Sequence, residues 1–172
     1  MLGLAAQWLG VNQTQANSVA PILISEEQGR HKSTFCRMLM PPQLARYYSD
    51  NLKLTAQGNP ERLLAEMGLL NMDEFDKFGA QKMPLLKNLM QMSSLNICKA
   101  YQKNFRSLPR IASFIGTSNR TDLLCDPTGS RRFICIEAEH DIDCTGIEHS
   151  QIYAQLKEEL LAGARHWFNK EE

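Results

Sequence analysis

Short apolar runs alternate along the chain with longer stretches in which apolar residues recur at the helical period. The apolar runs, which predict strands, cover residues 19–25, 69–72, 95–102, 111–118 and 132–138, with a short strand or turn at 47–51. The stretches that predict helices cover residues 33–40, 60–66, 77–92 and 150–168. Because the two signals alternate, the pattern predicts an α/β fold with three layers around a central, mostly parallel sheet.

Prolines refine the helix boundaries in this outline. Pro41 and Pro42 predict the end of the helix that precedes them, and Pro60 suits the first turn of the helix that it begins. Pro84 falls inside the stretch 77–92, and we expect it to kink that helix or divide it in two.

The composition is that of an ordinary globular protein. Hydrophobic residues make up 43% of the 172 residues and charged residues 22%, and the formal net charge is zero. This length fits one domain, so we interpret residues 1–15 as a helical lead-in to a single domain at 16–172. Neutrality argues against a protein that is basic throughout, but it is compatible with a local basic patch.

The five cysteines are scattered and never spaced as CxxC. This arrangement argues against a disulfide framework or a zinc site and favours a reducing compartment. No apolar run approaches the ~18 residues of a membrane span, and the apolar start lacks the basic segment of a signal peptide. We therefore expect a cytoplasmic protein with no membrane partner.

The segment EEQGRHKST at residues 26–34 lies between a predicted strand and a predicted helix, which is the setting of a phosphate-binding loop. In such a loop Lys32 reaches the β- and γ-phosphates, and the Ser33 hydroxyl ligates magnesium. Unpaired amide groups at the helix start bind the other phosphate oxygens. The residues expected around the nucleotide are Gln28, Gly29, Arg30, His31, Lys32, Ser33 and Thr34.

This segment departs from the strict pattern GxxxxGK[ST], because Glu26 and His31 stand at the two glycine positions. A carboxylate at Glu26 or Glu27 that pointed inward would repel phosphate. His31 places a side chain where the backbone normally approaches the ligand closely, although histidine tolerates positive φ better than most residues. A plain polar turn is the alternative interpretation of the segment alone.

Asp73 and Glu74 directly follow the strand predicted at 69–72. In a P-loop ATPase the first carboxylate of such a pair helps to hold magnesium, and the second takes a proton from the attacking water. Acidic residues also favour helix N-termini, so a purely structural role is the alternative. We interpret Asp76 as a capping or solvated acid.

The strand predicted at 111–118 ends in a polar cluster, FIGTSN, whose last residue is Asn119. An asparagine here can bind the attacking water or the γ-phosphate, although serine–asparagine pairs also favour ordinary turns. The loop, the acidic pair and the polar strand tip occur in the order of a P-loop NTPase domain. We therefore expect the three segments to bind ATP and Mg²⁺ together.

Arg131 and Arg132 precede the last predicted strand. One interpretation is an arginine finger, which stabilises charge on the transferred phosphoryl group, usually in the site of a neighbouring subunit. Successive strand residues point to opposite faces, so we expect one of the two to reach phosphate. The alternative is that both are solvated, or paired with Glu137 and Glu139.

The chain is locally basic between residues 99 and 132, although it is neutral overall. The first part of this segment holds Lys99, Tyr101, Lys103, Phe105, Arg106 and Arg110. Such a mixture suits single-stranded nucleic acid, because cations contact phosphates and aromatic rings stack on bases. The four cations are therefore candidate nucleic-acid contacts, and a solvated hairpin whose rings face the core is the alternative.

The motifs ILISEEQGRHKSTF, NMDEFDKF, SFIGTSN and DPTGSRRF, in this order, resemble the virulence-associated protein E family. These proteins are P-loop ATPases related to superfamily-three helicases and are encoded mainly on phages and mobile elements. The resemblance covers residues 16–168, and its most specific stretch is GTSNRTDLLCDPTGSRRF. The loop of the family reads closer to QGxGKST, so His31 is a departure.

This resemblance implies a role for each motif. It makes Lys32 and Ser33 the phosphate and magnesium residues, Asp73 and Glu74 the acidic pair, Asn119 the sensor, and Arg131 or Arg132 the finger. It places residues 99–110 like a DNA-contacting hairpin.

The function implied is Mg-dependent ATP hydrolysis on single-stranded or duplex DNA, in replication or mobilisation of a mobile element, by a homo-oligomer such as a ring. The alternatives are an ATP-binding regulatory module with little or no hydrolysis, and a structural DNA-binding protein with a vestigial site.

Overall fold

The structure is a computed structural model, and it describes residues 1–11, 16–98, 105–120 and 132–167. Its α-helices are α1 (Leu2–Leu9), α2 (Lys32–Met38), α3 (Pro60–Glu66), α4 (Met83–Gln91) and α5 (His149–Leu161). Its strands are β1 (Ala20–Ile24), β2 (Tyr48–Ser49), β3 (Leu69–Met72), β4 (Ser94–Cys98), β5 (Phe105–Pro109), β6 (Ser113–Ser118) and β7 (Phe133–Glu137). Short 3₁₀ helices η1 to η4 lie at Pro42–Tyr47, Ala56–Gly58, Phe75–Lys77 and Ala80–Lys82.

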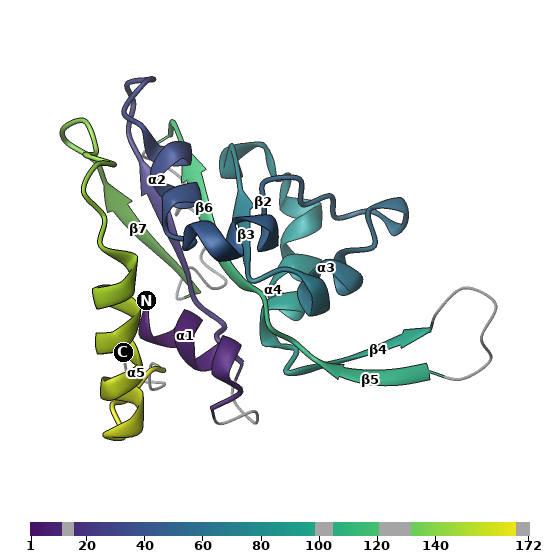
Figure 1. The fold of residues 1–172 in the computed structure, drawn as a ribbon. Helices are drawn as coiled ribbons and strands as arrows, with labels where there is room; N and C mark the ends of the chain where they lie inside the picture. The colour runs from purple at the N-terminus through teal and green to yellow at the C-terminus, as the bar shows by residue number, and fades with distance from the viewer. Residues whose placement is uncertain (12–15, 99–104, 121–131, 168–172) are drawn as a thin grey trace.

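A five-stranded sheet forms the centre of the domain, in the order β2–β3–β6–β1–β7 (Figure 1). Each neighbouring pair of strands in it is parallel. Parallel neighbours need crossover connections, and helices in these connections cover the faces of the sheet. The predicted α/β fold with a central parallel sheet is therefore confirmed.

Helices lie on both faces of this sheet. On one face, strand residues such as Ile22, Leu70 and Phe114 form the larger core with α3 and α4. On the other face, Leu23 and Ile115 pack with α1 and α2, while α5 packs on α1. Successive residues of a strand point to opposite faces, so a strand that is covered on both sides must be apolar at nearly every position. The resulting three layers match the prediction.

Gly116 lies at the centre of the sheet, where a side chain would meet Ile22. It lies on β6, level with Ile22 of β1 and with Met72 of β3. A Cβ atom at Gly116 would lie 2.6 Å from Cδ1 of Ile22, which is too close for any side chain without a shift of Ile22. Glycine at this position therefore leaves room for the Ile22 side chain on its face of the sheet.

A second, two-stranded antiparallel sheet, β4–β5, projects from the body of the domain (Figure 1). The sequence predicts strands at 95–102 and 111–118 around a hairpin or a long turn, and the two runs do not pair with each other. The second run is β6 of the central sheet, and β4 pairs instead with β5. The strand β5 was not recognised because all its side chains are exposed, so it lacks an apolar run.

The structure refines two helix predictions. The helix α4 begins at Met83 with Pro84 in its first turn, after the separate 3₁₀ helix η4. The stretch 77–92 is therefore not one helix, and of the two predicted outcomes it is divided rather than kinked. A proline has no amide hydrogen, but in the first turn of a helix this hydrogen has no acceptor within the helix, so nothing is lost. The helix α5 ends at Leu161 rather than near 168, and Gly163 follows it with a φ of 82°.

The N-terminal helix α1 is packed into the domain. Trp8 stacks on Tyr153 of α5, with ring centroids 5.6 Å apart, and its indole nitrogen donates to the carbonyl of Gly68 at 3.0 Å. Across the residues that the structure describes, no helix combines the length and the apolar character that a membrane crossing requires.

Candidate nucleotide-binding site

The carboxyl ends of β1, β3 and β6 meet at one edge of the sheet, where open parallel sheets bind their ligands. The register places Ile24 beside Ser118 and Met72 beside Gly116. The residues that follow these strands surround a cleft of about 460 Å³, within the usual range of ligand pockets. The cleft is lined by Gln28, Gly29, Arg30, His31, Lys32, Ser33, Thr34, Asp73, Glu74, Thr117, Ser118 and Asn119. The structure thus brings together the loop, the acidic pair and the polar strand tip.

The loop between β1 and α2 turns through two left-handed residues, Gly29 with a φ of 85° and His31 with a φ of 59°. His31 stands at the second glycine position of the motif, and its backbone has the conformation that glycine favours. Histidine reaches this region more readily than most residues. The departure from the motif therefore leaves the loop with a glycine-like turn just before Lys32.

The Lys32 ammonium is bonded to neutral oxygen atoms. Its Nζ donates to Ser25 Oγ at 2.6 Å and to Asn119 Oδ1 at 2.9 Å, and the side chain is only 8% exposed. Burial lowers the pKa of Lys32, as does the nearby charge of Arg30, while Asp73 acts in the opposite direction. These acceptors orient the ammonium without cancelling its charge, so it can attract an anion in the cleft.

The Asp73 carboxylate connects the loop with the tip of β6. Its Oδ1 accepts hydrogen bonds from Ser33 Oγ at 2.9 Å and from Thr117 Oγ1 at 2.6 Å. In the described part of the chain, no cluster of three or more histidine, cysteine or acidic side chains could hold a metal ion by itself. Ser33 and Asp73 nevertheless fit magnesium, which uses one or two protein ligands and completes its shell with water and substrate phosphates.

Glu74 follows in a left-handed conformation with a φ of 51°. Its backbone N–H donates to Thr117 Oγ1 at 3.3 Å. Its carboxylate Oε2 pairs with Lys77 Nζ at 2.6 Å, in an exposed ion pair one 3₁₀ turn along the chain. The carboxylate predicted to act as a base therefore lies in the wall of the cleft beside a lysine.

The sequence matches a family model, that of the virulence-associated protein E-like domain, over residues 10–172. The chain belongs to this family. No curated protein matches it. Among solved structures, the domain is similar to the apo structure of the NrS-1 C-terminal region (305–718), with 20% identity and a TM-score of 0.55 over 94% of this chain and 40% of that chain.

An A form apo structure of the same NrS-1 region matches with 22% identity and a TM-score of 0.53, over 91% of this chain and 37% of that one. At such identities the likeness shows the fold alone. The virulence-associated protein E-like domain thus spans about 40% of the length of the first of these structures.

In this virulence-associated protein E-like domain, the acidic residues of the loop do not line the cleft. Arg30 Nη2 pairs with Glu27 Oε2 at 2.6 Å, and Arg30 Nη1 lies 3.8 Å from Asp141 Oδ1. Neither Glu26 nor Glu27 belongs to the residues around the cleft. The sequence left open whether these carboxylates point inward, and neither of them lines the cleft.

Asp76 is bonded to the strand tip. Its Oδ1 accepts a hydrogen bond from Ser118 Oγ at 2.7 Å, and Ser118 Oγ in turn accepts the backbone N–H of Arg120 at 3.0 Å. The interpretation of Asp76 as a capping or solvated acid did not foresee this hydrogen bond, although the residue is only half-buried and does not line the cleft. This bond ties the segment after the acidic pair to β6.

Arg132 lies at the opposite edge of the sheet from the cleft. It precedes β7, whose first residue, Phe133, is level with Ala20 at the start of β1. The cleft begins beyond Ile24, roughly 13 Å along the strand at ~3.3 Å per residue. A finger role for Arg132 therefore requires the cleft of another copy, and Arg131 lies outside the described residues.

The projecting hairpin presents an aromatic ring and a cation to solvent. Phe105 is 70% exposed, and Arg106 next to it on β5 is exposed as well. The alternative in which the ring faces the core is therefore wrong for Phe105. Lys99 and Lys103 lie outside the described residues, so their predicted contact with nucleic acid stays a prediction.

Arg110 was predicted to contact nucleic acid, and its burial makes that prediction wrong. The side chain is 1% exposed and donates to the carbonyls of Met90 at 2.6 Å, Asn17 at 2.7 Å and Ala112 at 2.8 Å. Burial lowers the pKa of its guanidinium to about 10. The sequence signal misled because a basic residue in a basic segment was assumed to be solvated.

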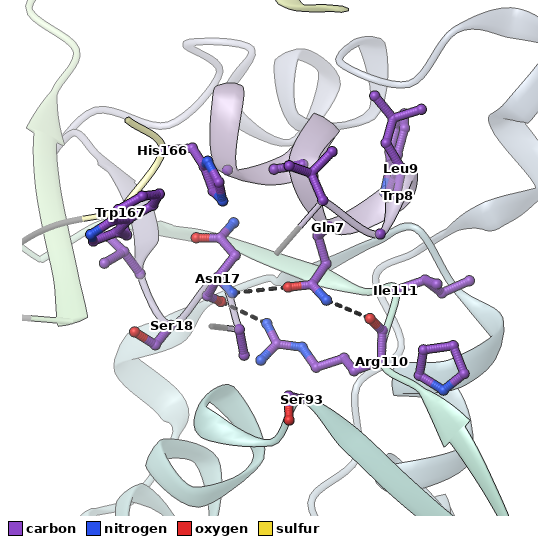
Figure 2. Close-up of a pocket in the computed structure, with 17 residues that line it drawn as sticks. Gln7, Trp8, Leu9, Asn17, Ser18, Ser93, Arg110, Ile111, His166 and Trp167 are labelled. Carbon is purple, nitrogen blue, oxygen red and sulfur yellow. Dashed lines mark hydrogen bonds between the residues drawn. The ribbon is translucent and has the colours of Figure 1, made fainter. Parts of the chain in front are cut away.

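A cavity of about 320 Å³ lies beside Arg110, at the base of the hairpin (Figure 2). The Gln7 side chain donates to the Arg110 carbonyl and accepts the backbone N–H of Asn17 at 2.9 Å. These groups bond to one another across the cavity wall (Figure 2). These hydrogen bonds link α1, the segment before β1 and the end of β5 to one another.

Ser25 and Thr117 are residues of the site that sequence reasoning missed. Ser25 Oγ accepts a hydrogen bond from the Lys32 ammonium, and Thr117 is hydrogen-bonded to both Asp73 and Glu74. Both are hydroxyl residues at or just beyond the end of a predicted apolar strand, the position that singled out Asn119. This position at the end of a strand was the sequence signal by which both residues could have been found.

Proposed function

We propose that the domain binds ATP with magnesium and hydrolyses it, as the helicase-like motor of a protein that acts on DNA. The observation that supports this most directly is the convergence of Lys32, the Ser33–Asp73 pair and Asn119 on one cleft. A lysine, a hydroxyl beside a carboxylate and a polar strand tip are the groups that hold a triphosphate and its metal in P-loop enzymes.

Each group has a task in the in-line attack of water on the γ-phosphate. Lys32 binds the β- and γ-phosphates, and Ser33 and Asp73 hold magnesium. The metal neutralises charge on the phosphates and the leaving group. Glu74 accepts the proton of the attacking water, and Asn119, which already binds Lys32, contacts the water or the γ-phosphate.

The arginine finger comes from another copy of the chain in this proposal. Arg132 stands at the edge of the sheet away from its own cleft, so a homo-oligomer such as a ring is needed to bring it to phosphate. Arg131, outside the described residues, stays the other candidate for the finger. A guanidinium there stabilises the charge of the transition state. Assembly and hydrolysis are therefore coupled.

The hairpin β4–β5 is the proposed contact to single-stranded or duplex DNA. Phe105 and Arg106 are exposed on a strand that projects from the body of the domain (Figure 1). A ring can stack on a base, and a guanidinium can contact phosphate or stack as well. Replication or mobilisation of a mobile element is the setting that the family suggests for such a motor.

The substitution Glu74→Gln tests the proposed hydrolysis. It keeps the size and polarity of the side chain and removes the base, so turnover is expected to fall at least ~100-fold while ATP binding persists. The measurement is phosphate release by the 172-residue chain, with and without single-stranded DNA, beside equilibrium binding of a fluorescent ATP analogue.

The matched control is Glu61→Gln, which changes an exposed glutamate in the first turn of α3. It is expected to keep wild-type turnover. Stimulation of the wild-type rate by DNA supports a motor. Turnover that Glu74→Gln leaves unchanged would remove Glu74 from the reaction.

A second function, ATP binding with little or no hydrolysis, is favoured by one contact. The Glu74 carboxylate is bonded to the Lys77 ammonium at 2.6 Å, and an ammonium there competes for the lone pairs that a base must offer to water. Tight ATP binding with negligible turnover, whether DNA is present or not, supports this module over the motor.

A further inference from the structure

Thr117 is bonded to both members of the acidic pair. Its hydroxyl donates to Asp73 Oδ1 at 2.6 Å and accepts the backbone N–H of Glu74 at 3.3 Å. We propose that Thr117 is a positioning residue, which holds Asp73 and Glu74 against Ser33 so that the cleft can take a magnesium ion with its nucleotide. This inference rests on the proposed function and adds a residue to it.

The direction of these hydrogen bonds follows from the chemistry of the groups. A backbone N–H can only donate and an ionised carboxylate can only accept. The Thr117 hydroxyl therefore donates its single proton in a hydrogen bond to Asp73. A lone pair of the same oxygen accepts the hydrogen bond from the backbone N–H of Glu74. Ser33 donates to the same Oδ1, so both hydroxyl groups approach one oxygen of Asp73. No hydrogen bond from the described residues reaches the second oxygen, Oδ2, which is therefore available to a water molecule of the metal shell.

The central sheet makes Thr117 a rigid support. It lies on β6 with β3 on one side and β1 on the other, and it is 3% exposed. A threonine is stiff about χ1 because it is branched at Cβ. The register Met72 to Gly116 puts Thr117 beside Asp73, directly after the last pair of β3 and β6.

The acidic pair needs this support because it stands beyond the end of its own strand. β3 ends at Met72, and Glu74 takes a left-handed backbone conformation that few residues other than glycine favour. The hydrogen bond from the Glu74 amide holds this turn against β6. Without the hydroxyl, Asp73 keeps the bond from Ser33 but loses the one from Thr117, and the Glu74 amide loses its acceptor. Both residues are then held less firmly at the cleft.

The substitution Thr117→Val tests the inference, because valine has the shape of threonine and lacks the hydroxyl. We expect it to weaken ATP-analogue binding in excess Mg²⁺ about 10-fold, the scale of one hydrogen bond to a charged group. Binding in EDTA, which depends on Lys32 and the loop, is expected to equal that of the wild type. The measurement is equilibrium binding to the full chain across a Mg²⁺ titration.

Thr117→Ser is the variant that separates the hydroxyl from packing. It keeps both hydrogen bonds and loses the buried methyl group, so its Mg²⁺ dependence is expected to stay within about twofold of the wild type. The matched control is Ser113→Ala, which removes a buried hydroxyl at the other end of β6, bonded to Asn17 Nδ2 at 3.1 Å. It is expected to lower stability and leave the Mg²⁺ dependence unchanged.

Two results would overturn the inference alone: a wild-type Mg²⁺ dependence in Thr117→Val, or a valine-like loss in Thr117→Ser. An equal loss by Thr117→Val in Mg²⁺ and in EDTA would also overturn it, since that pattern means general disturbance of the cleft. Failure of the wild-type chain to bind ATP in either condition would instead overturn the proposed function, and the inference with it.

Discussion

The two edges of the central sheet each hold a buried cation, and the cations differ in what they bond to. At the carboxyl edge, Lys32 lines a cleft and donates mainly to side-chain oxygens, those of Ser25 and Asn119, with a longer bond of 3.4 Å to the Ser25 carbonyl. At the opposite edge, Arg110 donates to backbone carbonyls only, from α4, from the segment before β1 and from its own turn. Burial lowers the pKa of both groups. The degree of burial therefore does not tell a binding cation from a structural one, whereas the type of partner does.

The type of acceptor matters because it decides whether the cation can still bind a ligand. Backbone carbonyls are part of the fold, and a guanidinium bonded to five of them has its donors committed to holding segments together. The two shortest hydrogen bonds of Lys32 go to side-chain oxygens, of which Asn119 also lines the cleft, and a phosphate can join them around the ammonium. Lys32 can therefore still bind a ligand, whereas the hydrogen bonds of Arg110 are all made within the fold.

The largest effect that would test this contrast is expected for Arg110→Met. Methionine keeps much of the volume of the side chain but leaves several buried carbonyls without a donor, so the free energy of unfolding is expected to fall by about 3 kcal/mol or more. Chemical denaturation measures the change. Arg106→Met, on the exposed strand β5, is the control, and its effect is expected to stay within ~0.5 kcal/mol.

A loss of DNA binding by Arg110→Met at unchanged stability would contradict this account. It would return Arg110 to the role of a nucleic-acid contact and would mean that the carbonyls around it do not need the guanidinium.

An intermediate effect is expected at the other edge for Lys32→Met. Binding of the ATP analogue is expected to weaken ~10- to 100-fold, the scale of hydrogen bonds between an ammonium and phosphate. Stability is expected to be unchanged or slightly higher, because the lowered pKa shows that the folded protein disfavours the charged form. Nucleotide titration and thermal unfolding measure the two quantities.

The control for Lys32→Met is Lys157→Met on α5, an exposed lysine away from the cleft. It is expected to change neither quantity. A loss of stability in Lys32→Met as large as in Arg110→Met would remove the distinction between the two cations.

The smallest effect, counted per pH unit, concerns Cys36, which is buried on α2. Burial raises the pKa of its thiol from the ordinary 9.0 to about 12, and the charge of Asp73 acts in the same direction. Between these pH values the folded chain keeps a proton that the unfolded chain has lost, so the free energy of unfolding falls as the pH rises. The slope is at most ~1.4 kcal/mol per pH unit for one group.

Denaturation of the wild type and of Cys36→Ala between pH 7 and 11 measures this slope. The difference between the two proteins below pH 8 is the baseline, since removal of the side chain also changes the packing. The raised pKa values of Tyr48 and Tyr153, both about 12, add a loss above pH 10 in both proteins. If the free energies of unfolding of the two proteins change in parallel from pH 8 to 10, the thiol has an ordinary pKa in the folded chain. Water would then reach Cys36, and this account would be wrong.

Much of the cleft could be predicted because its signals are local. A strand that runs into a polar turn and then into a helix is visible at residues 19–40, and the acidic pair directly follows an apolar run. The positions of Lys32 and Asp73 relative to their own strands followed from these runs. Their meeting in one cleft needed only the rule that parallel strands share a carboxyl edge.

The support of the cleft could not be predicted in the same way. Thr117 was passed over because its bonds to Asp73 and Glu74 depend on which residues of β3 and β6 are level, and that register is a property of the pair. Arg110 was misread because its basic neighbours in sequence are not its neighbours in space. A side chain that bonds to carbonyls of segments far away in sequence leaves no mark in the local pattern.

By itself, the sequence determined the alternation of strands and helices, the order of the three motifs and the choice of residues that can hold phosphate and metal. These follow from hydrophobic periodicity and from side-chain chemistry, which act over a few residues. Only the tertiary structure decided that β6 lies between β3 and β1, that β4 pairs with β5, that Arg110 is buried and that Arg132 stands away from its own cleft. The reason is physical: strand pairing and burial depend on contacts between distant segments, which form only when the whole core packs.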